Sequence, residues 1–108
     1  MKKLFPALSF LLLFSLSFAV FAQKSERDRE WNTPVEPFRI IGNVYYVGAA
    51  EITSFLIATK EGHFLTDGGY EETAPQIMAN IVKLGFKPED VKYLLNTQAH
   101  FDHAGGLA

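Results

Sequence analysis

The stretch Thr97–Gly106, which reads TQAHFDHAGG, holds the most informative side chains of this 108-residue chain. It follows the apolar run 91–97 (VKYLLNT), which predicts a buried strand, and it leads into small residues that could begin a helix. In proteins that mix strands and helices, functional residues gather where a strand ends, because the rigid sheet holds the loop in place. We therefore expect an α/β (α+β) fold with its functional site in residues 97–106, here named the metal loop.

Metal binding is the chemistry that this loop favours. Two histidines and a carboxylate, His100, Asp102 and His103, lie within four residues of one another. Imidazole nitrogens and carboxylate oxygens bind zinc at about 2 Å. Because neighbouring loop residues can face different ways, His100 and the pair Asp102 and His103 could serve two metals about 3.5 to 4 Å apart. The alternative is that both histidines lie on the surface and that Asp102 is a helix N-cap, a position that aspartate favours.

Upstream of the metal loop, short apolar runs separated by turn residues predict four strands. We expect these strands at 38–41, 44–47, 54–59 and 63–66. Turn residues separate the first from the second and the third from the fourth, so each pair is expected to form a hairpin. His63 lies inside the last of these strands, so we interpret it as a structural residue.

A helix is predicted between the fourth strand and the strand at 91–97. Thr73 followed by Gln76 fits a capping box at its start, and Gly85 supplies its end. Ile77, Ile81 and Leu84 recur at helical spacing, so this face should lie on the sheet. The same spacing predicts that Asn80 and Lys83 point outward, and residues 87–90 are expected to form a turn or a short helical cap.

The first 22 residues predict a cleavable signal peptide. Two lysines precede the apolar stretch 4–18, and the small residue Ala22 fits a cleavage site. A transmembrane anchor is the alternative, but the stretch is near the short end for crossing a bilayer and no basic flank follows it. We expect a polar, solvated lead-in segment at 23–36, a domain at 37–108, and residence in the periplasm or secretion, with no membrane anchor after cleavage.

Composition excludes several other classes of function. The net charge is −2 and no cluster of lysine or arginine marks a face for phosphates, so nucleic acid binding is not expected. The chain contains no cysteine, so neither disulfides nor a lipoprotein anchor can contribute. A domain this small buries little surface, so it would need a bound metal, a partner chain or further chain to be stable.

Several segments together resemble the metallo-β-lactamase superfamily. Its first metal motif is usually His-x-His-x-Asp-His, and the matching residues here are Gln98, His100, Asp102 and His103, with Gln98 in place of the first histidine. Residues 65–69 (LTDGG) resemble the superfamily's Asp-Gly motif at the end of an earlier strand. Residues 37–48 (PFRIIGNVYYVG) are similar to the third subclass of class B β-lactamases, one branch of which carries glutamine at the first ligand position.

The resemblance implies an αββα sandwich of which this chain supplies only the N-terminal half. Gln98 and His100 would bind the first zinc, and Asp102 and His103 the second, each with a later histidine that would lie beyond Ala108. Asp102 would also orient the attacking water, and Asp67 would support the metal loop from behind. We therefore expect a fragment of a longer enzyme that is inactive alone, since a catalytic zinc needs three protein ligands.

The function implied is zinc-dependent hydrolysis of the β-lactam ring of antibiotics, with one or two zinc ions. An amide oxygen is a poorer zinc donor than imidazole, so the site of Asp102 and His103 should be favoured over that of Gln98. One alternative is a hydrolase of the same fold acting on a lactone, thioester or phosphodiester. Another is an exported metal-binding protein without catalysis. The turn at Gly68-Gly69 is expected to be tight, with positive φ, and not a phosphate cradle.

Overall fold

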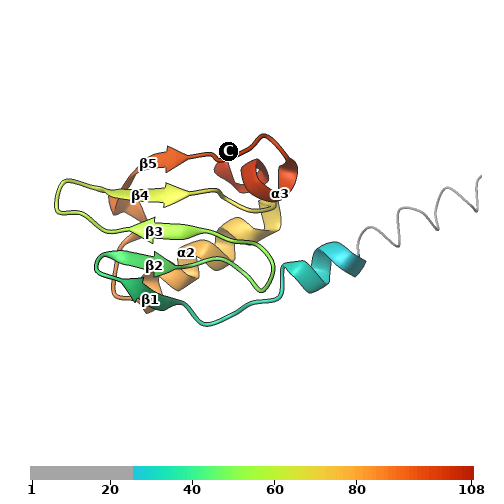
Figure 1. Ribbon diagram of the computed structural model, residues 1–108, viewed down its shortest axis with the longest axis horizontal. Coiled ribbons are helices and arrows are strands. Elements are labelled where there is room, and N and C mark those ends of the chain that lie inside the picture. Colours follow the sequence, from blue (N-terminus) through green and yellow to red (C-terminus); the bar gives the residue numbers. More distant parts are fainter. Residues whose placement is uncertain (1–25) are drawn as a thin grey trace, which may run out of the picture.

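A five-stranded sheet is the main feature of the computed structural model, which describes residues 26–108 (Figure 1). Its strands follow the order of the sequence: β1 (Phe38–Ile41), β2 (Val44–Tyr46), β3 (Phe55–Ile57), β4 (His63–Thr66) and β5 (Val91–Leu95). The first four pair in antiparallel fashion, whereas β5 runs parallel to β4. A parallel neighbour requires a crossover connection, and the chain between β4 and β5 provides it.

The crossover consists mainly of helix α2 (Ala74–Lys83), which lies across one face of the sheet (Figure 1). Single 3₁₀ turns precede and follow it, η1 (Glu71–Thr73) and η2 (Pro88–Asp90). After β5 the chain forms the short helix α3 (Phe101–Ala104) and the 3₁₀ turn η3 (Gly105–Leu107). Within residues 26–108 no helix is long and apolar enough to cross a membrane, and the predicted signal peptide lies outside the described residues.

The hydrophobic core lies between α2 and the sheet. Its buried members are Val47, Leu56, Leu65, Ile77 and Ile81. The predicted apolar face of the helix is confirmed, because Ile77 and Ile81 are almost fully buried and Leu84 packs against the same cluster. The helix ends where predicted: Gly85 has a φ of +89°, a conformation that favours glycine. All the predicted strands are found, and those at 38–41 and 63–66 have the predicted bounds.

The prediction that Asn80 points outward is wrong. Asn80 is 5% exposed, and its Nδ2 donates to the carbonyl oxygens of Val47 (3.0 Å) and Gly48 (3.2 Å). These carbonyls lie just beyond the end of β2, where the sheet no longer pairs them. Buried carbonyls need a donor, and the helix supplies one from the Asn80 amide.

The predicted capping box at Thr73 and Gln76 is not formed either. Thr73 is the N-cap residue of α2 but makes no side-chain cap hydrogen bond. Its hydroxyl donates instead to the side-chain oxygen of Asn32 (2.6 Å), and the Gln76 amide donates to the Asn32 carbonyl (2.9 Å). Both side chains therefore hold the lead-in segment against the domain.

The lead-in segment is more ordered than a solvated tail. Residues 26–31 are helical and are here named the lead-in helix. The chain after it is tied to the loop between β2 and β3, where the amide of Ala50 donates to the carbonyl of Thr33 and that of Glu51 to the carbonyl of Trp31. Most of its side chains are exposed, as predicted.

The strand at 91–97 is shorter than predicted and is not buried. It spans Val91–Leu95, and Tyr93, Leu94 and Leu95 are each between 44% and 52% exposed. β5 lies at the edge of the sheet, paired only with β4. The core cluster under α2 reaches β5 only at Val91, so the rest of the strand lacks cover among the described residues.

Candidate metal centre

The centre begins with Asp67, the residue that follows β4. Because β4 and β5 are parallel neighbours, their carboxyl ends meet at one edge of the sheet, which brings Asp67 to Thr97. The Asp67 carboxylate accepts hydrogen bonds from the amide (2.7 Å) and the hydroxyl (2.6 Å) of Thr97. Behind it, the fully buried Ser54 hydroxyl donates to the backbone oxygens of Thr66 and Asp67. Asp67 is thus a fixed, buried carboxylate directly beneath the metal loop.

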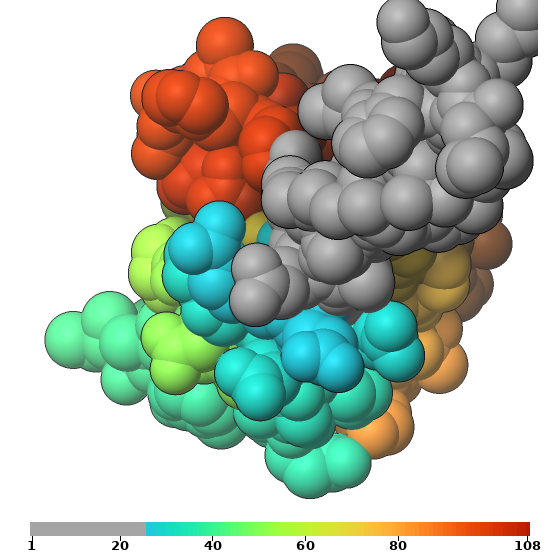
Figure 2. All heavy atoms as spheres, turned by 90° about the vertical axis from the view of Figure 1, so that its right-hand side faces the viewer, coloured from blue at the N-terminus to red at the C-terminus, as the bar shows by residue number. Residues whose placement is uncertain are grey.

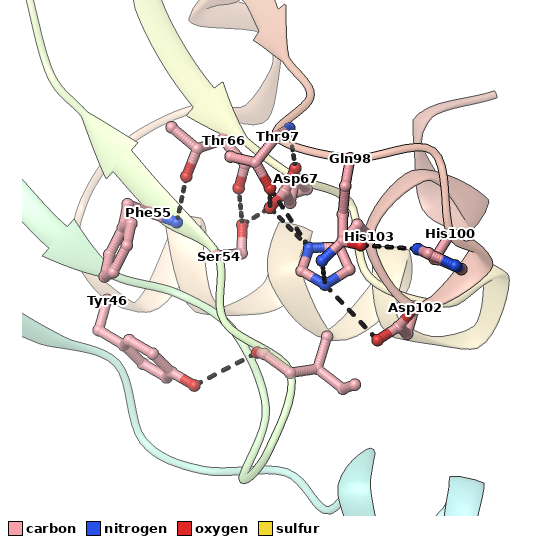
Figure 3. Close-up of polar contacts among 11 residues, drawn as sticks. Tyr46, Ser54, Phe55, Thr66, Asp67, Thr97, Gln98, His100, Asp102 and His103 are labelled. Carbon is pink, nitrogen blue, oxygen red and sulfur yellow. Dashed lines mark hydrogen bonds and ion pairs between the residues drawn. The ribbon is translucent and has the colours of Figure 1, made fainter.

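His103 lies on this carboxylate. Its Nδ1 is 2.9 Å from Asp67 Oδ2 (Figure 3). Burial raises the pKa of Asp67, but the hydrogen bonds from His103 and Thr97 outweigh that effect, so the pKa lies below its usual value. Asp67 therefore remains charged at neutral pH and accepts a hydrogen bond from the Nδ1–H of His103, which leaves the Nε2 lone pair of His103 available to a ligand.

The remaining predicted ligands gather around His103 Nε2. That nitrogen lies 2.8 Å from Gln98 Nε2 and 3.5 Å from Asp102 Oδ2. The other end of the Gln98 amide, Oε1, lies 2.6 Å from His100 Nδ1. Gln98 therefore sits between the two histidines, and the contacts link the four predicted residues in the order His100, Gln98, His103 and Asp102 (Figure 3).

Four glycines allow the metal loop to pack backbone against backbone. The amide of Gly68 donates to the carbonyl of His103 (2.8 Å), and the amide of Gly106 donates to the carbonyl of Gly69 (3.0 Å). A Cβ atom on Gly106 would lie 2.2 Å from the Gly68 oxygen, far inside van der Waals contact. The sequence signal for this junction is the Gly-Gly pair in each motif, although neither pair by itself indicates that the two meet.

The tight turn after β4 is only partly as predicted. Gly69 has the expected positive φ, +67°, but the second positive φ, +56°, belongs to Asp67 and not to Gly68. A left-handed conformation is uncommon outside glycine, although aspartate tolerates it better than most residues. It lets the Asp67 carboxylate turn back toward Thr97 and His103.

For Asp102 and His63 the sequence raised a structural role, as a helix N-cap and as a strand residue respectively. Asp102 is not the N-cap of α3, because His100 holds that position and Asp102 lies in the first turn. His63 is structural as expected: it is 8% exposed, its Nδ1 accepts the amide of Thr59 (3.0 Å), and its ring packs edge-on against Phe86.

The donor set fits zinc. Imidazole and carboxylate are its usual nitrogen and oxygen ligands, and the second nitrogen of a zinc-binding histidine commonly donates to a carboxylate, as His103 does to Asp67. Among residues 26–108, however, no group of three or more histidine, cysteine, aspartate or glutamate side chains could hold one metal ion. The described donors therefore do not make up a full coordination sphere by themselves.

Comparison with known proteins identifies the family. The model of the metallo-beta-lactamase superfamily matches residues 47–108, more than half of the chain. The chain belongs to the metallo-β-lactamase superfamily. The match includes the Asp67 turn and the whole metal loop, so the superfamily and fold class predicted from the sequence are confirmed.

Solved structures place the chain near class B3. A subclass B3 metallo-β-lactamase from a soil metagenome, MEM-A1, is 56% identical with a TM-score of 0.70, over 71% of this chain and 29% of that one. The class B3 di-zinc metallo-β-lactamase LRA-12 from an Alaskan soil metagenome is 48% identical with a TM-score of 0.70, over 71% of this chain and 29% of that one. Both relatives are metallo-β-lactamases, LRA-12 being a di-zinc enzyme, and the chain corresponds to part of their fold.

A curated relative acts on a different substrate. The N-acyl homoserine lactonase of Bacillus cereus is 31% identical, over 48% of this chain and 30% of that protein. The chain spans about 30% of the length of the proteins that it matches.

Proposed function

We propose that this chain contributes the first metal loop of a zinc-dependent hydrolase that opens the β-lactam ring of antibiotics. The observation that carries the proposal is the convergence of Gln98, His100, Asp102 and His103 at the carboxyl ends of β4 and β5. The 56% identity to a subclass B3 enzyme supports β-lactams as the substrate class.

Two positions for zinc follow from the arrangement. Gln98 and His100 would hold one ion, and Asp102 and His103 the other. The second position is favoured, because it combines a carboxylate with an imidazole whose other nitrogen is fixed by Asp67, whereas the first relies on a neutral amide. Each position requires further ligands from outside the described donors.

The chemistry is divided between the metal and the protein. Bound zinc supplies a Lewis acid that polarises the scissile carbonyl and lowers the pKa of a water. Asp102 accepts a hydrogen bond from the attacking water and fixes its direction. Asp67 keeps His103 in one tautomer, so that Nε2 is always the nitrogen that faces the site.

Hydrolysis of nitrocefin by the full-length gene product that carries this sequence tests the proposal. We expect turnover that a chelator abolishes and that added zinc restores. The His103→Ala variant should lose turnover, whereas Lys83→Ala, a change in an exposed ion pair with Glu36 far from the metal loop in sequence, should retain it. Intact nitrocefin in the presence of zinc would reject the proposal.

Lactone hydrolysis is the second candidate, and the lactonase of Bacillus cereus favours it. In both reactions a water attacks the carbonyl carbon of a ring, so the same metal ligands could serve either reaction. The full-length gene product should be assayed in parallel with nitrocefin and an N-acyl homoserine lactone. Cleavage of the lactone with nitrocefin left intact would assign lactonase activity in place of β-lactamase activity.

We also propose export to the periplasm, supported by the lysines and the apolar stretch of the first 22 residues. Fractionation of cells that express the gene should recover the mature protein with the periplasmic contents, and its N-terminal sequence should begin at Gln23. A protein that keeps residue 1 and stays in the cytoplasm would contradict this.

A further inference from the structure

The lead-in helix and the metal loop lie at the same end of the molecule, although they stand at opposite ends of the described sequence (Figures 1 and 2). Tyr70 is the residue between them. It follows the glycine turn after β4, and only 6% of its surface is exposed. Tyr70 makes one polar contact and one aromatic contact, and these reach different parts of the chain. It therefore connects two segments that strand pairing does not join.

On one side Tyr70 contacts the lead-in helix. Its hydroxyl donates to Oδ1 of Asp28 at 3.2 Å. Burial and the negative charge of Asp28 raise the pKa of Tyr70 to about 12. The phenol therefore stays protonated at neutral pH and remains a hydrogen-bond donor.

On its other side Tyr70 contacts the metal loop. Its ring lies against that of Phe101, with centroids 5.6 Å apart and planes tilted by 31°. Phe101 is the first residue of α3 and stands between His100 and Asp102 in the chain. A shift of this ring would therefore move two of the proposed zinc ligands together.

The same residues surround one pocket. Asp28 and Asn32 of the lead-in segment, Tyr70 and Glu71 after β4, and Phe101 and Gly105 of the C-terminal segment all line it. Tyr70 therefore joins the lead-in helix to α3 beside this pocket, in addition to the contacts of Asn32 and of the glycine junction that also hold these segments to the domain.

We propose that Asp28 and Tyr70 are positioning residues for the metal loop: the hydrogen bond from Tyr70 to Asp28 fixes the Tyr70 ring, which in turn fixes Phe101 and the first turn of α3. The zinc-related part of this inference rests on the proposed function. The mechanical coupling between the lead-in helix and α3 does not.

The test uses the full-length gene product and three changes around this contact. Tyr70→Phe removes the hydroxyl and keeps the ring, and Asp28→Ala removes the acceptor. Asp28→Asn keeps an acceptor oxygen, so it should behave like the unchanged protein. Tyr46→Phe is the control, because it also removes a phenol hydroxyl, one that donates to the carbonyls of Ala49 and Ile52 and takes no part in the contact between Tyr70 and Asp28.

Zinc affinity and the absorption spectrum of the cobalt(II)-substituted protein report the ligand geometry. We expect Tyr70→Phe and Asp28→Ala each to raise the zinc dissociation constant about tenfold and to broaden the cobalt bands. The double variant should be no weaker than either single one, since both break the same contact. Unchanged zinc affinity and cobalt spectrum in Tyr70→Phe would overturn the inference.

Hydrogen exchange of a peptide covering residues 97–107 separates this inference from the proposed function. Exchange should be about tenfold faster in Tyr70→Phe and Asp28→Ala and unchanged in Tyr46→Phe, with or without metal. If the unchanged protein takes up no zinc, the proposed function fails while faster exchange still supports the coupling. Equal exchange in all variants would reject the coupling even if the protein hydrolyses nitrocefin.

Discussion

His103 lies on the buried carboxylate of Asp67, whereas His100, three residues earlier in the same loop, lies on the exposed amide of Gln98. The His103 half of the metal loop is therefore anchored to the sheet by a charged group. The side chains of Gln98 and His100 contact other side chains of the loop, and the backbone beside them is supported by the ring contact of Phe101 with Tyr70. We infer from this difference that folding sets the position of His103, whereas the side chains of Gln98 and His100 are freer to move.

The anchored half also depends on the glycine junction, so the largest effect is expected there. In Gly106→Ala the new Cβ atom would lie 2.2 Å from the Gly68 oxygen, and the backbone of η3 would have to move. We expect the free energy of unfolding of the metal-free protein to fall by about 3 kcal/mol in urea denaturation.

Gly105→Ala is the matched control for that substitution. Its Cβ atom would come no closer than 3.1 Å to the Glu71 amide, so a small shift accommodates it. The expected cost is below about 1 kcal/mol. Equal losses in the two variants would show that the junction is not a close backbone contact.

The second largest effect is expected at Asp67. In Asp67→Ala the amide and hydroxyl of Thr97 lose their acceptor and His103 loses its partner. We expect the free energy of unfolding to fall by about 2 kcal/mol and zinc affinity at the site of His103 to fall by roughly 10-fold to 100-fold. Urea denaturation and zinc competition measure the two effects.

Ser54→Ala separates support of the carboxylate from support of the backbone. The Ser54 hydroxyl bonds to the backbone oxygens of Thr66 and Asp67 but not to the carboxylate. We expect it to reduce stability without changing zinc affinity. A zinc affinity in Asp67→Ala as high as in Ser54→Ala would argue against the anchoring of His103.

Local patterns predicted the strands and the buried face of α2, because alternation and helical spacing depend on neighbours in the sequence. The clustering of Gln98, His100, Asp102 and His103 followed in the same way from a single loop. The contacts of Asn80 could not be predicted, since they depend on which carbonyls the end of β2 leaves unpaired. At Asp67 the residues alone indicated only a turn. Its contact with Thr97 could not be predicted, because that contact depends on the parallel pairing of β4 and β5.

At Gln98 a substitution is expected to increase zinc affinity. In Gln98→His an imidazole nitrogen replaces the neutral amide between His100 and His103. We expect the more weakly held zinc to bind about tenfold more tightly in titrations of the full-length gene product, since imidazole is the better donor. Affinity for the more tightly held zinc, at Asp102 and His103, should change less. No change in either binding step would count against a role for Gln98 at the weaker site.

The smallest effect is expected for His100→Ala in the metal-free protein. His100 is exposed and its side chain contacts the exposed Gln98 side chain, so its loss should change the free energy of unfolding by no more than about 0.5 kcal/mol. His103→Ala leaves the buried Asp67 carboxylate without one of its donors and should cost about 1 kcal/mol or more. Both variants should nevertheless bind zinc more weakly. In His100→Ala only the zinc affinity should fall, whereas in His103→Ala the zinc affinity and the free energy of unfolding should both fall. The reason is that only His103 also contacts the buried Asp67 carboxylate. Equal destabilisation by the two substitutions would mean that both halves of the loop are anchored alike.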